Sequence, residues 1–159
     1  MTIAGRLTRQ PRHVWRELFP ASEDLPPRRS FADDLEDLRR LAWEGLYRED
    51  DVEQLLCAVR DDAPLTEIAA DSGTLVSRYC AMRSELRRIR APELQAHVLA
   101  LSEIFDYLAQ LLHYAVALLA SAWRSEALRE QQQKVGSVGP QGERLRKVVA
   151  ELDRLAGKR

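Results

Sequence analysis

The chain has 159 residues, of which 45% are hydrophobic and 31% are charged. This length suits a single domain with one core, and this composition excludes an intrinsically disordered chain. The 24 lysines and arginines nearly balance the 25 aspartates and glutamates, so the formal net charge is −1, which argues against a surface generally adapted to nucleic acid.

The N-terminal segment is basic and precedes a strongly acidic stretch over residues 20–71. We predict that residues 1–29 form an irregular N-terminal arm that ends after two consecutive prolines. The arm mixes positive charge with aromatic side chains: Arg6, Arg9, Arg12, Arg16, Trp15 and Phe19. This mixture suits contact with an acidic or membrane surface, and it equally suits docking of Trp15 and Phe19 on the rest of the protein.

Residues 30–60 are expected to be helical, because their apolar residues recur at intervals of three and four. Ser30 followed by Asp33 predicts a capping box at the start of the first helix. The pattern does not decide whether a second short helix starts anew after the acidic run Glu49-Asp50-Asp51. Trp43 lies near the apolar stripe of the first helix, which makes it a candidate core or interface anchor.

A further helix is predicted over residues 65–90. Pro64 fits the first turn of a helix, and Pro92 pushes the residue before it out of the helical conformation. The next helix therefore follows after almost no loop, and such a short connection makes the two helices antiparallel neighbours.

Within that helix, residues 65–85 resemble the DNA-binding helix-turn-helix. Ala69 and Gly73 occupy the places where that motif has a small residue and a turn glycine. Ser72 and Thr74 occupy places where the motif is usually apolar, and one continuous helix explains the same apolar positions with a single period. The resemblance implies a DNA-binding regulator, which stays open as an alternative.

The longest apolar series runs from Leu94 to Ala122 at spacings of four and three, which predicts one long helix over residues 93–131. Over residues 111–120 this helix is apolar almost all round, so other helices must surround it. The core stripes that we expect to face each other are Leu101, Phe105, Leu108, Leu112 and Leu119 on this helix and Leu75, Tyr79, Met82 and Leu86 on its neighbour.

Residues 136–142 contain three glycines and predict a flexible connector to a last amphipathic helix over residues 143–157. No stretch shows the period of two that a strand requires. The sequence therefore predicts an all-α fold, an antiparallel bundle of four to five helices with one long central helix. We expect residues 30–159 to form this bundle as a single domain.

Two features bear on location. Cys57 and Cys80 are isolated and lack the spacing of a zinc site, so both are expected to be small, buried, reduced residues of a cytoplasmic protein. The best candidate for a membrane span is interrupted by Gln110, His113 and Ser121, and we expect no transmembrane segment.

Polar side chains offer few candidate sites. Arg83, Arg87 and Arg90 share a helical face by their spacing, which suits either a phosphate clamp or ion pairs with the acidic first helix. Asp106 and His113 also share a face, but the paired Glu-x-x-His motifs of di-metal bundles are missing, so we expect a hydrogen-bonded polar strip and no metal.

No nucleophile has a histidine in a recognisable local arrangement, so we expect no enzyme and no cofactor. The prediction is a non-catalytic scaffold, adaptor or assembly subunit that acts through protein–protein contact. Its partner is expected to be a second copy, as a homodimer, or another helical protein, because the long helix exceeds its neighbour in length. A helix-turn-helix regulator and a ligand-binding or enzymatic bundle are the alternatives. The candidate interaction residues are Trp15, Phe19, Trp43, Arg83, Arg87 and Arg90.

Overall fold

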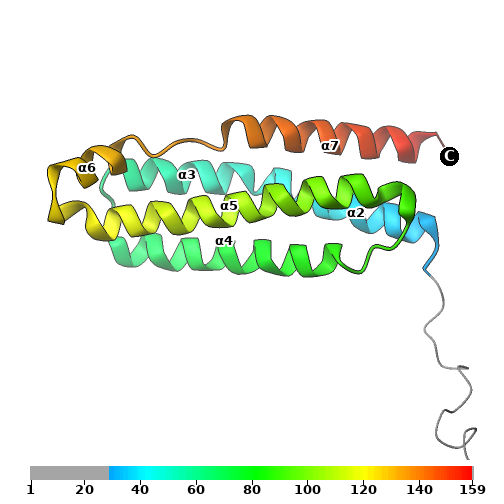
Figure 1. The fold of residues 1–159 in the computed structure, drawn as a ribbon, viewed down its shortest axis with the longest axis horizontal. Coiled ribbons are helices and arrows are strands. Elements are labelled where there is room, and N and C mark those ends of the chain that lie inside the picture. Colours follow the sequence, from blue (N-terminus) through cyan, green and yellow to red (C-terminus); the bar gives the residue numbers. More distant parts are fainter. Residues whose placement is uncertain (1–28, 159) are drawn as a thin grey trace, which may run out of the picture.

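The computed structural model describes residues 29–158, and every regular element in that range is helical (Figure 1). In chain order the elements are α2 (Phe31–Tyr47), α3 (Glu49–Arg60), α4 (Leu65–Leu86), the 3-10 turn η1 (Pro92–Leu94), α5 (Gln95–Ser121), the 3-10 turn η2 (Ala122–Arg124), α6 (Glu126–Gln133) and α7 (Gly139–Gly157). Trp15, Phe19 and the rest of residues 1–28 lie outside the described residues.

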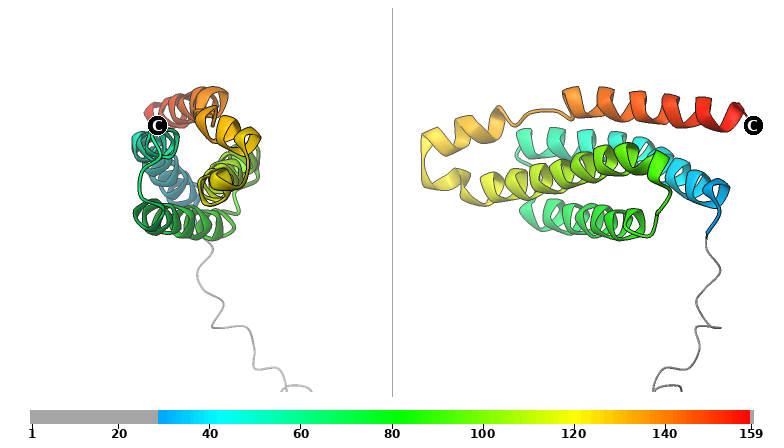
Figure 2. Two further views of the ribbon diagram at one scale, coloured as in Figure 1. Left: turned by 90° about the vertical axis from the view of Figure 1, so that its left-hand side faces the viewer. Right: turned by 45° about the vertical axis from the view of Figure 1, so that its right-hand side comes forward.

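The helices lie side by side and alternate in direction (Figure 1). α2 and α3 follow one another along one side of the bundle, α4 and α7 lie on either side of them, and α6 turns back at the end of α5. Viewed along the bundle, α5 closes the side opposite α2 and α3 (Figure 2). This arrangement confirms the predicted all-α antiparallel bundle with one long central helix.

The region predicted as helical over residues 30–60 contains two helices. The Ser30 hydroxyl accepts the Asp33 N–H at 3.1 Å, and the Asp33 carboxylate accepts the Ser30 N–H at 3.0 Å, so the capping box is present. α2 ends at Tyr47, and a new helix begins at Glu49 after the turn residue Arg48. The acidic run that follows suits the positive end of a helix dipole.

Residues 65–86 form one uninterrupted helix. Gly73 lies in its middle with open space around it, so the turn that a helix-turn-helix requires at this position is absent.

The end of α4 differs from the prediction, because the helix stops at Leu86 and not at residue 90. The cause is a tertiary contact with α2. The buried carboxylate of Asp34 accepts the backbone N–H groups of Arg90 and Ala91 at 2.7 and 2.8 Å, which fixes both residues in the turn before α5. A carboxylate of α2 thus holds the turn that follows α4.

The prediction of one helix over residues 93–131 is wrong, because α5 ends at Ser121. Ser125 has an extended backbone, with φ −159° and ψ 153°, and its hydroxyl accepts the Leu128 N–H at 3.2 Å, so it caps a separate helix, α6. With 27 residues against 22 in α4, α5 is ~40 Å long and its neighbour ~33 Å at 1.5 Å per residue. The excess length is therefore smaller than the sequence suggested.

The last helix begins at Gly139, ahead of the predicted residue 143. Gly139 has a positive φ of 47°, which favours glycine, and Pro140 follows in the first turn, where its missing N–H costs nothing. The connector before α7 is correspondingly shorter than expected.

The two stripes predicted to face each other on α4 and α5 are both buried, which confirms their register. At their centre, the rings of Tyr79 and Phe105 are fully buried and pack with centroids 5.6 Å apart. Burial raises the pKa of the Tyr79 hydroxyl well above its ordinary value, so this side chain stays neutral at physiological pH.

α2 passes so close to Phe105 that only glycine fits at position 45. A Cβ atom on Gly45 would lie 2.5 Å from Cε1 of Phe105 and 3.6 Å from a methyl group of Leu145 in α7. Phe105 therefore lies where α2, α4 and α7 all approach α5.

Replacing Phe105 with alanine is expected to lower the free energy of unfolding by about 3–5 kcal/mol, because the lost ring leaves a cavity in a close-packed core. Urea denaturation followed by circular dichroism measures the change. Tyr107→Ala is the control, since Tyr107 is 41% exposed and its loss should cost far less. Equal stability of Phe105→Ala and the parent would contradict the packing described.

Gly45→Ala is expected to destabilise the protein by about 1–3 kcal/mol through overpacking against Phe105. The matched variant Gly73→Ala adds the same methyl group in the middle of α4, where nothing beyond the adjoining backbone of α4 itself lies within 4 Å. That substitution should stabilise the protein by about 0.5–1 kcal/mol. Thermal melts of both variants test the pair, and shifts of the same sign would count against the close approach of α2 to α5.

Candidate functional site

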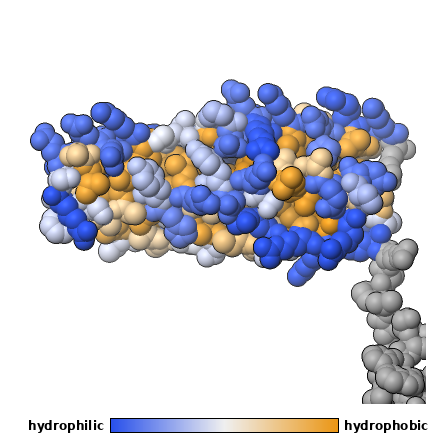
Figure 3. All heavy atoms as spheres, viewed as in Figure 1, coloured by the Kyte–Doolittle hydropathy of each residue, from blue (hydrophilic) through white to orange (hydrophobic). Residues whose placement is uncertain are grey.

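One face of α5 is left uncovered by the other helices. Leu99 is 61% exposed, Tyr107 41% and Tyr114 52%. At 100° per residue these positions fall within about 80° of one another, so the three side chains lie on one side of the helix. The face of the molecule that α5 crosses shows hydrophobic residues between hydrophilic ones along its length (Figure 3).

Small and polar residues complete this open face. Ala96 and Ala117 are exposed on the same side of the helix as Tyr114, and Glu103 and Gln110 lie between the aromatic positions. We name the set the α5 strip: Ala96, Leu99, Glu103, Tyr107, Gln110, Tyr114 and Ala117. Sequence reasoning missed it, although the seven-residue spacing of the two tyrosines was a signal.

The segment predicted to be apolar all round is largely covered within the chain. Leu112, Ala115, Leu118 and Leu119 are buried. Tyr114 remains exposed, so the bundle covers this segment except on the side of the α5 strip. Among residues 29–158, packing therefore leaves this segment of α5 exposed mainly along the α5 strip.

The stretch Pro92–Arg124 is long and apolar enough to cross a membrane by length and composition alone. In the structure, 44% of its most apolar window is buried. Its buried stripe packs on α4, as the core helix of a bundle does.

A second exposed aromatic residue lies where α5 ends. Trp123 in η2 is 80% exposed, and its indole N–H donates to the Ala120 carbonyl at 3.0 Å. The Arg124 guanidinium lies over the ring, 5.5 Å from its centroid. This tryptophan is held in place by local contacts and stays open to solvent.

The three candidate arginines do not act as one set. Arg83 pairs with Asp106 of α5 and not with the first helix. Arg87 and Arg90 are exposed, and both lie beyond the end of α4, so the shared helical face predicted for them is not formed. The prediction that they clamp a phosphate or an acidic partner stays a prediction.

Trp43 is half exposed on α2 and is not a core residue. Its indole N–H donates to Asp153 of α7 at 3.3 Å, and Arg39 one turn earlier donates to the same carboxylate at 3.0 Å. Trp43 therefore anchors a contact between two helices of the chain.

The polar residues of α5 form hydrogen bonds with one another. The Gln110 amide donates to Asp106 at 2.8 Å, while His113 is exposed. Among residues 29–158, no group of three or more His, Cys, Asp or Glu side chains is arranged to hold a metal ion.

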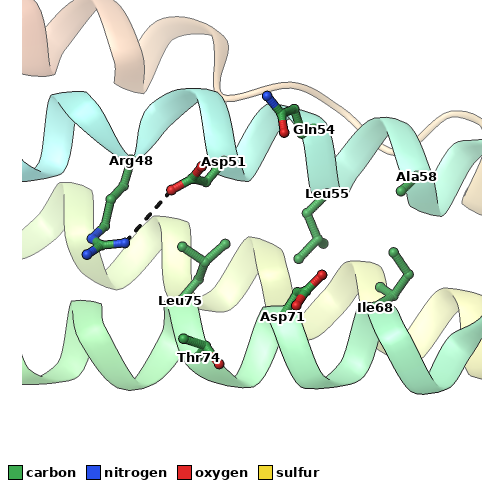
Figure 4. A pocket seen from close by; sticks show the side chains of 9 residues that line it. All are labelled: Arg48, Asp51, Gln54, Leu55, Ala58, Ile68, Asp71, Thr74 and Leu75. Atoms are coloured by element: carbon green, nitrogen blue, oxygen red, sulfur yellow. Dashed lines mark ion pairs between the residues drawn. The ribbon is translucent and has the colours of Figure 1, made fainter.

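A groove of about 500 Å³ runs between α3 and α4 (Figure 4). Its lining combines apolar and charged side chains: Arg48, Asp51, Gln54, Leu55, Ala58, Ile68, Asp71, Thr74 and Leu75. Leu55, Ile68 and Leu75 point into the space between the helices. The two aspartates are exposed, so an apolar floor lies beneath an acidic rim.

Ion pairs between α2 and α4 involve other residues than the sequence suggested. The Arg78 guanidinium donates to both carboxylate oxygens of Glu44 at 2.5 Å each, and Arg40 donates to Glu85 at 2.7 Å. The hydrogen bonds from Arg78 hold the pKa of Glu44 below its ordinary value.

Comparisons of the chain with protein-family models, with curated proteins and with solved structures found no match.

Replacing Glu44 with glutamine is expected to destabilise the protein at neutral pH by up to about 1 kcal/mol. Because the pKa of Glu44 is lowered in the folded protein, its pair with Arg78 stabilises the fold above the ordinary glutamate pKa and loses effect as pH falls. The difference in melting temperature from the parent should therefore shrink below about pH 4.5. Glu143→Gln, on the exposed side of α7, is the control, and a Glu44→Gln deficit that is constant with pH would contradict the pairing.

Proposed function

We propose that this protein is a non-catalytic scaffold or assembly subunit that works through protein–protein contact, and that the α5 strip is its contact surface. The observation that carries the proposal is the exposure of Leu99, Tyr107 and Tyr114 on one side of a helix whose other side forms the core. Aromatic residues are enriched in the buried centres of protein interfaces. Single exposed apolar residues are common on protein surfaces, whereas a contiguous exposed apolar patch often marks an interaction site.

The partner that we propose is a second copy of the chain in a two-fold dimer. In such a dimer the same strip of each copy faces the other, and a two-fold arrangement is the commonest for identical chains. The small residues Ala96 and Ala117 let two helix backbones approach closely. Glu103 pairs with Arg144 of α7, and the Gln110 amide donates to Asp106. The carboxylate of Glu103 and the side-chain carbonyl of Gln110 keep acceptor capacity for tyrosine hydroxyls of the second copy.

The size of the strip fits this role. A helix of 27 residues is ~40 Å long, which offers a contact along most of the bundle. Specific interfaces usually bury about 1,600 Å² in total. Flanking residues of α4 and α7 would have to contribute to such an area, since both helices lie beside α5.

Gel filtration with light scattering tests the proposal. The parent is expected to have a mass near twice the 18.2 kDa of one chain, with the dimer favoured at higher concentration. The double variant Leu99→Glu/Tyr114→Glu should be monomeric, because two carboxylates would face a second copy of themselves across the contact.

The matched control is Tyr47→Glu/Leu65→Glu, which changes the same two residue types at positions that are 81% and 40% exposed away from the strip. It should behave as the parent. A parent that stays monomeric at every concentration would contradict self-association, and a control that dissociates equally would place the contact elsewhere.

A further inference from the structure

The groove between α3 and α4 lies in the most acidic part of the chain. Residues 49–71 contain eight acidic side chains and one basic one, Arg60. Among the described residues, Asp71 and Glu67 form no ion pair, and the nearest guanidinium to Asp51 is Arg48 at 3.8 Å. Arg48 lines the groove and pairs with Asp51, so the negative charge that the described residues leave without a partner here is that of Asp71 and the neighbouring Glu67.

The floor of the groove is apolar, and Leu55, Ile68 and Leu75 are largely buried between the two helices. Ile68 and Leu75 of α4 face Leu55 and Ala58 of α3 across it (Figure 4). Leu65 lies one turn before Ile68, at the end of the groove formed by Ile68 and Ala58, and is 40% exposed. An occupant that fits must bring both positive charge and large apolar side chains.

The N-terminal arm has this composition. Residues 1–19 contain four arginines and one glutamate, with Trp15, Leu18 and Phe19 close together in sequence. Positive charges at Arg12 and Arg16 flank Trp15. A tryptophan flanked by arginines can place its ring on an apolar floor while both guanidinium groups reach acidic rims.

The arm is also long enough to reach the groove. It joins the bundle at Arg29, at the start of α2, and α2 spans ~25 Å before Arg48 at the near end of the groove. Phe19 lies ten positions before Arg29, and a chain of that length spans at most ~35 Å when extended. Between Arg29 and the groove, the pair of Glu44 and Arg78 joins α2 to α4.

We propose that the groove between α3 and α4 binds the N-terminal arm of the same chain, with Trp15 and Phe19 on the apolar floor and the arginines of the arm at the acidic rim. The contact covers the groove and neutralises part of its charge. It is independent of the α5 strip, which lies on another side of the bundle.

The experiment places a spin label on the arm of the full-length chain. Cys57 and Cys80 are exposed, and not buried as the sequence suggested, so both are replaced with serine. Glu17→Cys then provides the single attachment site. The label should broaden the backbone amide signals of residues 54–58 and 68–75 and leave those on the outer side of α7 sharp. Added salt should weaken the effect, because it screens pairs of exposed charges.

A pair of charge variants tests the recognition. Asp51→Lys/Asp71→Lys reverses the acidic rim and should abolish the selective broadening. The matched control Glu126→Lys/Glu143→Lys changes the net charge equally on α6 and α7 and should leave it intact. All four positions are exposed, and circular dichroism of each variant verifies that the bundle is retained.

Two results would overturn the proposal. The first is a failure of the selective broadening: no broadening in the parent, broadening spread evenly over the bundle, or selective broadening that persists in Asp51→Lys/Asp71→Lys. The second comes from a mixture of spin-labelled chains with isotope-labelled chains that carry no spin label. Broadening of the groove signals in that mixture would show that the arm comes from another copy. Neither result bears on the dimer test at Leu99 and Tyr114, so failures of the two proposals can be told apart.

Discussion

The position of Phe105 determines how the helices of this bundle fit together. Its ring packs on Tyr79 of α4 and lies against the backbone of α2 at Gly45, which Leu145 of α7 also approaches. Interiors of proteins are close-packed, so the volume of this one ring sets the spacing of helices that are distant in sequence. Gly45 and Phe105 form a complementary pair, since a larger residue at one requires a smaller residue at the other.

The sequence predicted the fold class and the core because both depend on local periodicity. The three-and-four spacing of Leu101, Phe105 and Leu108 is typical of a helix, and the Ala91-Pro92 break makes its predecessor an antiparallel neighbour. The ends of the helices were predicted less well. The turn after α4 is held by Asp34 of another helix. This residue lies 56 positions before Arg90 in sequence, so the local sequence around residue 90 could not predict the contact.

The break after α5 had a local signal that the apolar period obscured. Ser125 is a good N-cap residue, and Glu126 begins the next helix, but the apolar spacing continues through Ala122 and favours one long helix. Candidate contact residues were hard to predict for a related reason. Periodicity identifies the buried side of α5, whereas the open side is recognised only once the neighbouring helices are in place. The pairing of Arg83 with Asp106 instead of the first helix depends on the same tertiary arrangement.

The contact between α2 and α7 has a consequence for the order of folding. Arg39 and Trp43 both donate to Asp153, across sequence separations of 114 and 110 residues. During synthesis, α2 emerges long before α7, so the face of α2 that contacts α7 is at first uncovered. The hairpin of α4 and α5 can already form at this stage, because its residues are close in sequence. The entropy cost of closing the long loop between α2 and α7 grows only slowly with loop length. Contacts between residues so distant in sequence nevertheless form slowly during folding. We therefore expect the docking of α7 to be the last step of folding. A nascent chain that stops short of Gly139 should expose on α2 the surface that α7 covers in the complete bundle.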